Sequence, residues 1–77
     1  MDFYQILNDQ LRDEYNDVIT YTMLSKEAKD PTAQVLRDIA REEYVHSKHL
    51  KDILLKSGKL MEDKDLENQA TEALDGI

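Results

Sequence analysis

Cysteine and tryptophan are absent from this chain of 77 residues, which also has only one proline and two glycines. Without cysteine the chain has neither a disulfide framework nor a thiolate metal site, as is usual in a reducing compartment. Because helix-breaking residues are scarce, two long stretches remain in which helices can run without interruption, one before Pro31 and one between Pro31 and Gly58.

Basic residues are outnumbered as well, with 10 lysines and arginines against 17 aspartates and glutamates and a net charge of −7. Nucleic acids and anionic membranes are bound through basic patches, so this balance argues against both and favours cations as partners. No apolar run is long enough to span a bilayer, and the start Met1-Asp2-Phe3 lacks the basic flank of a signal peptide. We therefore expect a soluble, cytoplasmic protein that binds neither nucleic acid nor membrane.

Capping and breaking residues mark where the helices begin and end. Asp2 suits the N-cap of a first helix, and Asp30 before Pro31 suits the N-cap of a second. Gly58 suits the position that follows the end of the second helix. A shorter amphipathic helix is predicted from apolar residues at helical spacing, which are Leu66, Ala70, Ala73 and Ile77. The predicted helices span about residues 2–28, 31–57 and 63–75.

The short turn at Lys29–Pro31 favours an antiparallel helical hairpin. Such a hairpin alone cannot cover the first helix, which has a second apolar stripe at Tyr15, Ile19 and Met23. A chain this small without disulfides usually needs a metal, oligomerisation or both. We therefore predict an all-α single domain, a two-helix hairpin plus a short C-terminal helix, that dimerises into a four-helix bundle.

Three ionisable residues occupy positions that the helical spacing assigns to buried faces. Glu43 and His46 are three apart and share one face of the second helix, and Glu14 takes an equivalent place on the first. The second-helix seam consists of Leu36, Ile39, Glu43, His46, Leu50 and Ile53, and the first-helix seam of Leu7, Leu11, Glu14, Val18, Tyr21, Ser25 and Ala28. Because an ionised carboxylate is costly to bury alone, a metal cation is the leading explanation.

In a symmetric hairpin, residues that are equally far from the turn lie at one level. The midpoint of Glu43 and His46 is position 44.5, and the midpoint between 44.5 and 14 is 29.25, which falls within the Lys29–Pro31 turn. The three side chains should therefore meet at one level of the hairpin. One chain then supplies half of a known di-metal ligand set, in which two helices of a bundle each give a Glu and two each give a Glu-x-x-His pair. A twofold-related copy would supply the other half, so a homodimer is the minimum assembly. Carboxylates with two imidazoles suit iron or manganese better than zinc.

Glu14 is followed seven residues later by Tyr21, and the second helix carries Ile39-Ala40-Arg41-Glu42-Glu43-Tyr44-Val45-His46. In these motifs the chain resembles the ferritin-like superfamily, specifically rubrerythrin-type chains and the short encapsulated ferritins, over roughly residues 7–54. The resemblance implies a di-iron site shared between two subunits, with Glu14 and His46 as terminal ligands and Glu43 as the bridging ligand. It also implies that O₂ or peroxide reacts there with ferrous iron.

Two departures from the family pattern narrow this expectation. Rubrerythrins hold four helices in one chain and often add a cysteine-ligated rubredoxin module, whereas this chain has half the helices and no cysteine. It is therefore more similar to the encapsulated ferritins, which build the site between subunits and reside inside an encapsulin-type shell. Their apolar docking tail is poorly matched by residues 72–77. The expected partner is a second copy, in a homodimer or a higher oligomer, with a protein shell as a further candidate partner and location.

Ferroxidase chemistry is the favoured function, because the chain lacks a cysteine-held centre that could return electrons to its iron. A rubrerythrin-like peroxide reductase with an external electron donor is the alternative within the same family. Two alternatives lie outside redox catalysis: a metal-binding protein that holds zinc or manganese, and a non-catalytic helical assembly module whose buried acids set the register of its helices.

The individual residues also have plainer interpretations. Glu43 and His46 could form a hydrogen-bonded pair without any metal. Asp17, one turn after Glu14, is either a solvated acid or an additional ligand of the kind that the resemblance implies. His49, one turn after His46, is either a surface residue or a further ligand. Tyr21 is expected in the core with its hydroxyl group hydrogen-bonded.

Overall fold

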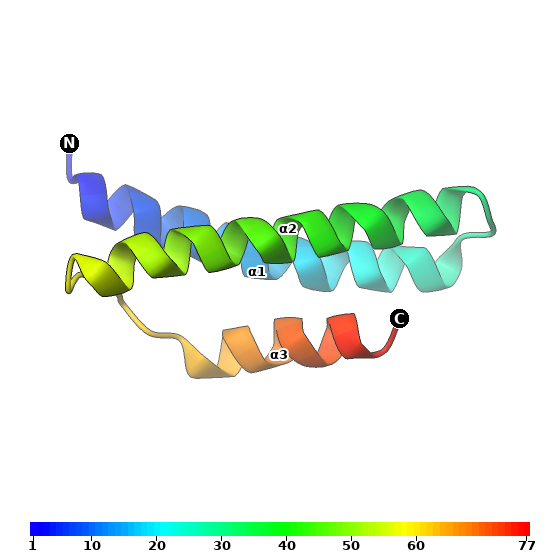
Figure 1. Cartoon of the computed structure of the whole chain (residues 1–77). Coiled ribbons are helices and arrows are strands. Elements are labelled where there is room, and N and C mark those ends of the chain that lie inside the picture. The colour runs from blue at the N-terminus through cyan, green and yellow to red at the C-terminus, as the bar shows by residue number, and fades with distance from the viewer.

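The computed structural model describes all 77 residues and contains three helices and no strand. They are α1 (Phe3–Glu27), α2 (Thr32–Lys56) and α3 (Lys64–Asp75). The first two run antiparallel as a hairpin, and α3 lies alongside them (Figure 1). The all-α prediction is confirmed, and each predicted helix boundary lies within one residue of the observed one. No helix combines the length and the apolar character that a membrane span requires.

The predicted roles of Asp2 and Gly58 at helix ends are confirmed. The Asp2 carboxylate accepts a hydrogen bond of 3.0 Å from the N–H of Gln5, which satisfies a free donor of the first turn of α1. Gly58 has a φ of +68°, the left-handed conformation that glycine adopts without steric cost. This turn allows the N–H groups of Gly58 and Lys59 to bond back to carbonyl oxygens of the last turn of α2.

The prediction that Asp30 caps α2 is wrong. Pro31 occupies the N-cap position, and no side chain caps the helix there. The Asp30 carboxylate instead accepts a hydrogen bond of 3.1 Å from the guanidinium of Arg37, with which it also forms an ion pair. The Asp30 carboxylate is thus engaged in a charge-assisted bond with Arg37 and does not accept from the backbone N–H groups of the first turn of α2.

The buried line of α2 lies one position later than predicted. It consists of four residues spaced by seven that are between 0 % and 4 % exposed, namely Ala33, Ala40, Ser47 and Leu54. By contrast, Ile53 is 47 % exposed and the side chain of His46 is 56 % exposed, so the prediction that both face inward is wrong for the single chain. Three of the four, Ala33, Ala40 and Ser47, have small side chains, which let two helices approach closely, and Leu54 joins the apolar core.

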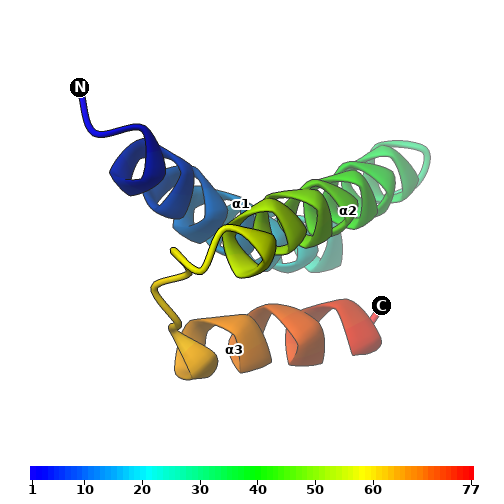
Figure 2. The same cartoon turned by 60° about the vertical axis from the view of Figure 1, so that its left-hand side comes forward.

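The third helix covers one side of the hairpin and leaves the other side open (Figure 2). Ala70 is fully buried, and Leu66 and Leu74 pack against a core formed by Leu11, Tyr15, Val18, Leu54 and Ala70. This arrangement accounts for part of the second apolar stripe, because Tyr15 and Ile19 belong to this packing while Met23 is 58 % exposed. The second neighbour of α1, expected from another molecule, is thus partly supplied by the same chain.

Polar side chains fix the connector between α2 and α3. Asn8 is 4 % exposed, donates to the carbonyl oxygens of Tyr4 at 2.8 Å and Lys59 at 3.0 Å, and accepts from the N–H of Met61 at 2.8 Å. Asp63 caps α3 by accepting a hydrogen bond of 3.1 Å from a backbone N–H of its first turn. The start of α3 is therefore held at a defined place on the hairpin.

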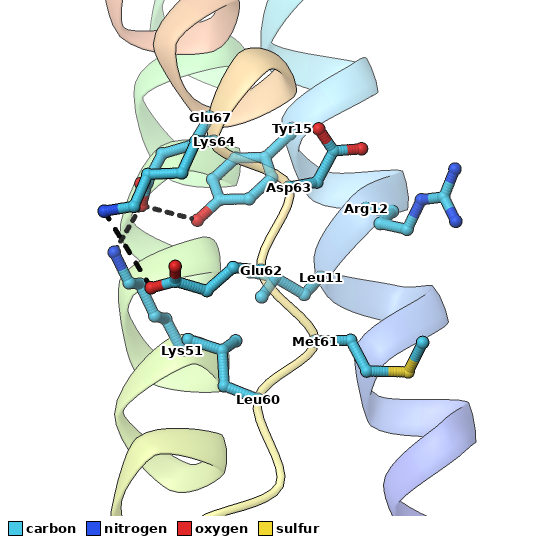
Figure 3. Close-up of a pocket in the computed structure, with 10 residues that line it drawn as sticks. All are labelled: Leu11, Arg12, Tyr15, Lys51, Leu60, Met61, Glu62, Asp63, Lys64 and Glu67. Carbon is cyan, nitrogen blue, oxygen red and sulfur yellow. Dashed lines mark hydrogen bonds and ion pairs between the residues drawn. The ribbon is translucent and has the colours of Figure 1, made fainter.

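The side chain of Glu67 ties α3 to both long helices. Its Oε2 atom accepts hydrogen bonds from the Tyr15 hydroxyl at 3.0 Å and from the Lys51 ammonium (Figure 3). The bond from Lys51, and then that from Tyr15, hold the pKa of Glu67 below its usual value of 4.5 against the opposing effect of burial. Protonation of Glu67 should therefore weaken the attachment of α3.

We expect acidification to remove this contribution to stability. Because the folded-state pKa of Glu67 is the lower one, its stabilisation is complete above the unfolded-state pKa and is lost as the pH falls through the folded-state value. Glu67→Gln should lower the free energy of unfolding by about 1–2 kcal/mol at neutral pH. Urea denaturation of both proteins at several pH values should show this difference shrinking toward acid, whereas a difference that is independent of pH would contradict the assignment.

Candidate metal centre

Glu14, Glu43 and His46 come together on the hairpin. One donor atom from each lies within 4.8 Å of the others. The Nδ1 atom of His46 is 3.7 Å from Oε2 of Glu14 and 3.6 Å from Oε1 of Glu43. The three residues thus lie at one level of the hairpin, as its symmetry about the turn predicts.

The two long helices hold these side chains on a rigid backbone. Each helix is an uninterrupted run of 25 residues, and Glu43 and His46 are separated by one turn of α2. The side chains of Glu14 and Glu43 are 17 % and 19 % exposed, whereas that of His46 is 56 % exposed. The carboxylates are therefore largely buried between the helices, and the imidazole lies at the edge of the hairpin.

One carboxylate oxygen of the cluster lacks a partner. The Oε2 atom of Glu14 is buried and is the only buried side-chain nitrogen or oxygen atom in the chain without a hydrogen bond. Leaving a buried polar atom unpaired costs roughly 1–3 kcal/mol, and more when the group is charged. A cation between the carboxylates and the imidazole would satisfy this oxygen.

The crowding of acids changes their protonation. The pKa of Glu43 is raised, chiefly because its protonated form can hydrogen-bond to Glu14. Burial and the negative charge of Glu14 raise this pKa further, whereas His46 lowers it. The pKa of Asp17 is also raised, by burial first and then by the charge of Glu43. A divalent cation at this position would relieve the repulsion among these carboxylates.

The donor atoms fit a divalent metal ion. Oxygen and nitrogen ligands lie about 2.0–2.2 Å from such ions, so two donors on the same ion are about 3–3.5 Å apart. The separations of His46 from Glu43 and Glu14, 3.6 Å and 3.7 Å, are slightly longer, and all three donors lie within 4.8 Å of one another, so side-chain rotations would be needed to bring them onto one ion. Two carboxylates with one imidazole, and no thiolate, suit iron or manganese.

The other candidate residues lie around this cluster. Asp17 is beside Glu43 and influences its pKa, but it is not one of the three converging donors. His49 is exposed, one turn beyond His46, and lies outside the cluster. Tyr21 is half-buried on α1.

Sequence reasoning missed the contact of Tyr15, Lys51 and Glu67 beneath α3 (Figure 3). One signal was available, because Glu67 precedes the buried Ala70 by three residues and therefore faces the same side of α3. An acid on that face calls for a partner, but the spacing does not say which residues of the hairpin provide it.

A family model described as Rubrerythrin matches residues 4–75, a range that includes all three members of the cluster. The chain belongs to the rubrerythrin family. Rubrerythrins are part of the ferritin-like superfamily, so the resemblance inferred from the motifs around Glu14 and Glu43 is confirmed. No curated protein and no solved structure matches the chain.

Rubrerythrin-family proteins typically bind iron, and this member brings two carboxylates and one imidazole close enough to hold a metal ion. The family match covers the residues of both long helices, and the fold brings Glu14, Glu43 and His46 of those helices together. Both findings fit a ferritin-like di-iron protein.

Proposed function

We propose that this rubrerythrin-family protein is a ferroxidase whose di-iron site is assembled from two copies of the chain. The observation that carries the proposal is the buried, unpartnered Oε2 atom of Glu14, which lies within reach of Glu43 and His46. Each chain offers two carboxylates and one imidazole, which is half of the four carboxylates and two histidines that hold two metal ions in such bundles. A twofold mate would therefore complete the ligand set.

Exposed apolar side chains support a second copy as the partner of the open face. Phe3 lies 11 residues before Glu14, so both are on nearly the same line of α1. Val35 and Ile53 lie 11 residues before and seven after His46, on nearly the same line of α2. These three apolar residues are 55 %, 55 % and 47 % exposed. Burying them against a mate would contribute about 25 cal/mol per Å² of apolar surface and would exclude water from the cluster.

Ferrous iron is the substrate of the proposed reaction. Two Fe(II) ions each lose one electron, and one O₂ takes up both electrons and two protons to become H₂O₂. Glu14 and His46 would act as terminal ligands, each bound to a single ion, whereas Glu43 would act as the bridging ligand. Because the pKa of Glu43 is raised, its binding to a cation releases any proton that it shares with Glu14.

The absence of cysteine favours iron oxidation over repeated peroxide reduction. With no cysteine, the chain has no cysteine-held redox centre that could return electrons to oxidised iron. Net oxidation of Fe(II) needs no such return, whereas a peroxide reductase would depend on an external donor for every turnover. We therefore place ferroxidase activity first and peroxide reduction second.

Anaerobic titration with Fe(II), followed by exposure to air, tests the proposal. We expect saturation at one Fe(II) per chain and the absorbance of oxidised iron after O₂ is admitted. His46→Ala should lose saturable uptake, and the matched control His49→Ala, one turn further along α2, should behave like the wild type. Uptake without oxidation would contradict ferroxidase activity and indicate a non-redox metal site. No uptake by the wild type would contradict the proposal as a whole.

A further inference from the structure

One polar group joins all three helices away from the metal-binding cluster. Tyr15 of α1, Lys51 of α2 and Glu67 of α3 meet at Oε2 of Glu67, and we refer to them as the three-helix junction (Figure 3). Tyr15 is 5 % exposed, and the side chains of Lys51 and Glu67 are 29 % and 24 % exposed. Their two hydrogen bonds are the only ones between side chains that connect α3 to the hairpin.

The three-helix junction and the candidate ligands share the same rigid helices. Tyr15 directly follows Glu14, so their side chains leave α1 about 100° apart. Lys51 follows His46 by five residues, which places the two about 140° apart around α2. Rotation of either helix about its axis therefore moves the junction residue and the ligand together. Contact with Glu67 restricts that rotation for both helices at once.

Close to the cluster, small side chains form much of the contact between the two long helices. The residues of α2 that face α1 near the cluster are small, with Ala40 and Ser47 at 0 % and 1 % exposure. Small side chains allow close approach but offer few interlocking atoms, whereas hydrogen bonds have preferred directions. Ala70 is the only residue of α3 that is fully buried. The hydrogen bonds at Glu67 therefore add a directional restraint to the apolar packing.

We propose that Tyr15, Lys51 and Glu67 are positioning residues for the metal site: through Glu67, α3 holds α1 and α2 at the rotation that aims Glu14 at Glu43 and His46. This inference rests on the proposed function, because it concerns the orientation of the same ligands. If the three-helix junction only stabilises the fold, disrupting it would lower the melting temperature but would leave the ligand geometry of the folded protein unchanged. If the junction positions the ligands, disrupting it would also change how the folded protein binds metal.

Three variants separate these roles. Glu67→Gln and Tyr15→Phe each alter the three-helix junction with little change in shape. Glu62→Gln is the matched control, because Glu62 forms an exposed ion pair with Lys64, 3.8 Å apart, next to the start of α3. Co(II) is titrated into each metal-free protein at a temperature where circular dichroism shows that all four proteins are folded.

We expect the wild type and Glu62→Gln to bind Co(II) with equal affinity and equal visible spectra. Glu67→Gln and Tyr15→Phe should bind Co(II) about 10-fold more weakly, which is the lower end of the losses seen when groups that orient metal ligands are removed. The visible spectra of their Co(II) complexes should also shift. Equal affinities and spectra for all four proteins would overturn the positioning role. Failure of the wild type itself to bind Co(II) would contradict the proposed function, and the positioning role with it.

Hydrogen exchange in the wild type provides a test that needs no variant. Coupling between two sites is reciprocal, so if the attachment of α3 favours metal binding, then metal must favour the attachment of α3. We expect Co(II) to slow amide exchange in residues 64–75. Slower exchange in α1 and α2 with unchanged exchange in α3 would contradict the proposal.

Discussion

Glu43→Gln should make the metal-free protein more stable at neutral pH while weakening its affinity for Fe(II) by more than about 100-fold. The loss should exceed the 10- to 100-fold that follows removal of a residue that only orients a ligand. The stability gain should be roughly 0.5–1 kcal/mol, the scale of partly exposed charge pairs, because the substitution removes the repulsion between Glu43 and Glu14. Fe(II) titration and urea denaturation measure the two effects.

The stability gain should depend on pH in a defined direction. Since the pKa of Glu43 is raised in the folded protein, its ionisation weakens folding as the pH rises through that value, and the penalty is absent below its usual value of 4.5. The advantage of Glu43→Gln should thus grow from acid to neutral pH. Glu42→Gln, which changes the exposed acid next in sequence, is the matched control and should alter neither quantity. A variant that is less stable than the wild type at neutral pH would show that Glu43 is satisfied without metal.

Saturating metal should raise the melting temperature of the wild type by about 10–20 °C. A ligand at 100 times its dissociation constant stabilises the folded state by about 2.7 kcal/mol, and each kcal/mol shifts the melting temperature of a domain of this size by about 4–8 °C. If two chains share the ions, the melting temperature should also rise with protein concentration. Thermal unfolding with Co(II) and with a chelator measures the shift.

His46→Ala provides the control for this metal effect. Its melting temperature should be the same with Co(II) and with the chelator, because His46 is the only imidazole within the cluster. A shift in His46→Ala as large as that in the wild type would mean that the metal stabilises the protein from another site.

The positions of the ligands could be predicted because they depend on local rules. Helices restrict Glu43 and His46 to one face, and a short turn at Pro31 brings residues at equal distances from it to one level. Glu14 therefore had to lie near Glu43 if both helices formed, and the structure brings them together. No knowledge of tertiary packing was needed for this step.

The exposure of His46 could not be predicted in the same way. Periodicity indicates which residues share a face, but the direction of that face depends on how closely the helices pack. The small residues Ala40 and Ser47 face α1, and this rotation leaves His46 and Ile53 at the edge. Choosing the buried face of α2 by its large apolar residues therefore places that face one position too early in the sequence.

The attachment of α3 was also beyond sequence reasoning. Its amphipathic pattern predicts that a face is buried, but not against which side of the hairpin. The choice depends on contacts between residues about 16 and 52 positions apart, those of Glu67 with Lys51 and Tyr15, which leave no periodic signal. This choice also matters for the cluster, since α3 covers Tyr15 and leaves the side chain of His46 exposed.

Native mass spectrometry of the wild type, loaded anaerobically with Fe(II), tests the shared site most directly. We expect a species with two chains and two iron ions, and we expect chelation to return it to single chains. Glu43→Gln should give neither the iron-loaded species nor the metal-dependent dimer. A monomer that binds no iron, or a dimer whose iron content is unchanged in Glu43→Gln, would contradict the assignment of Glu14, Glu43 and His46 as half of a site completed by a second chain.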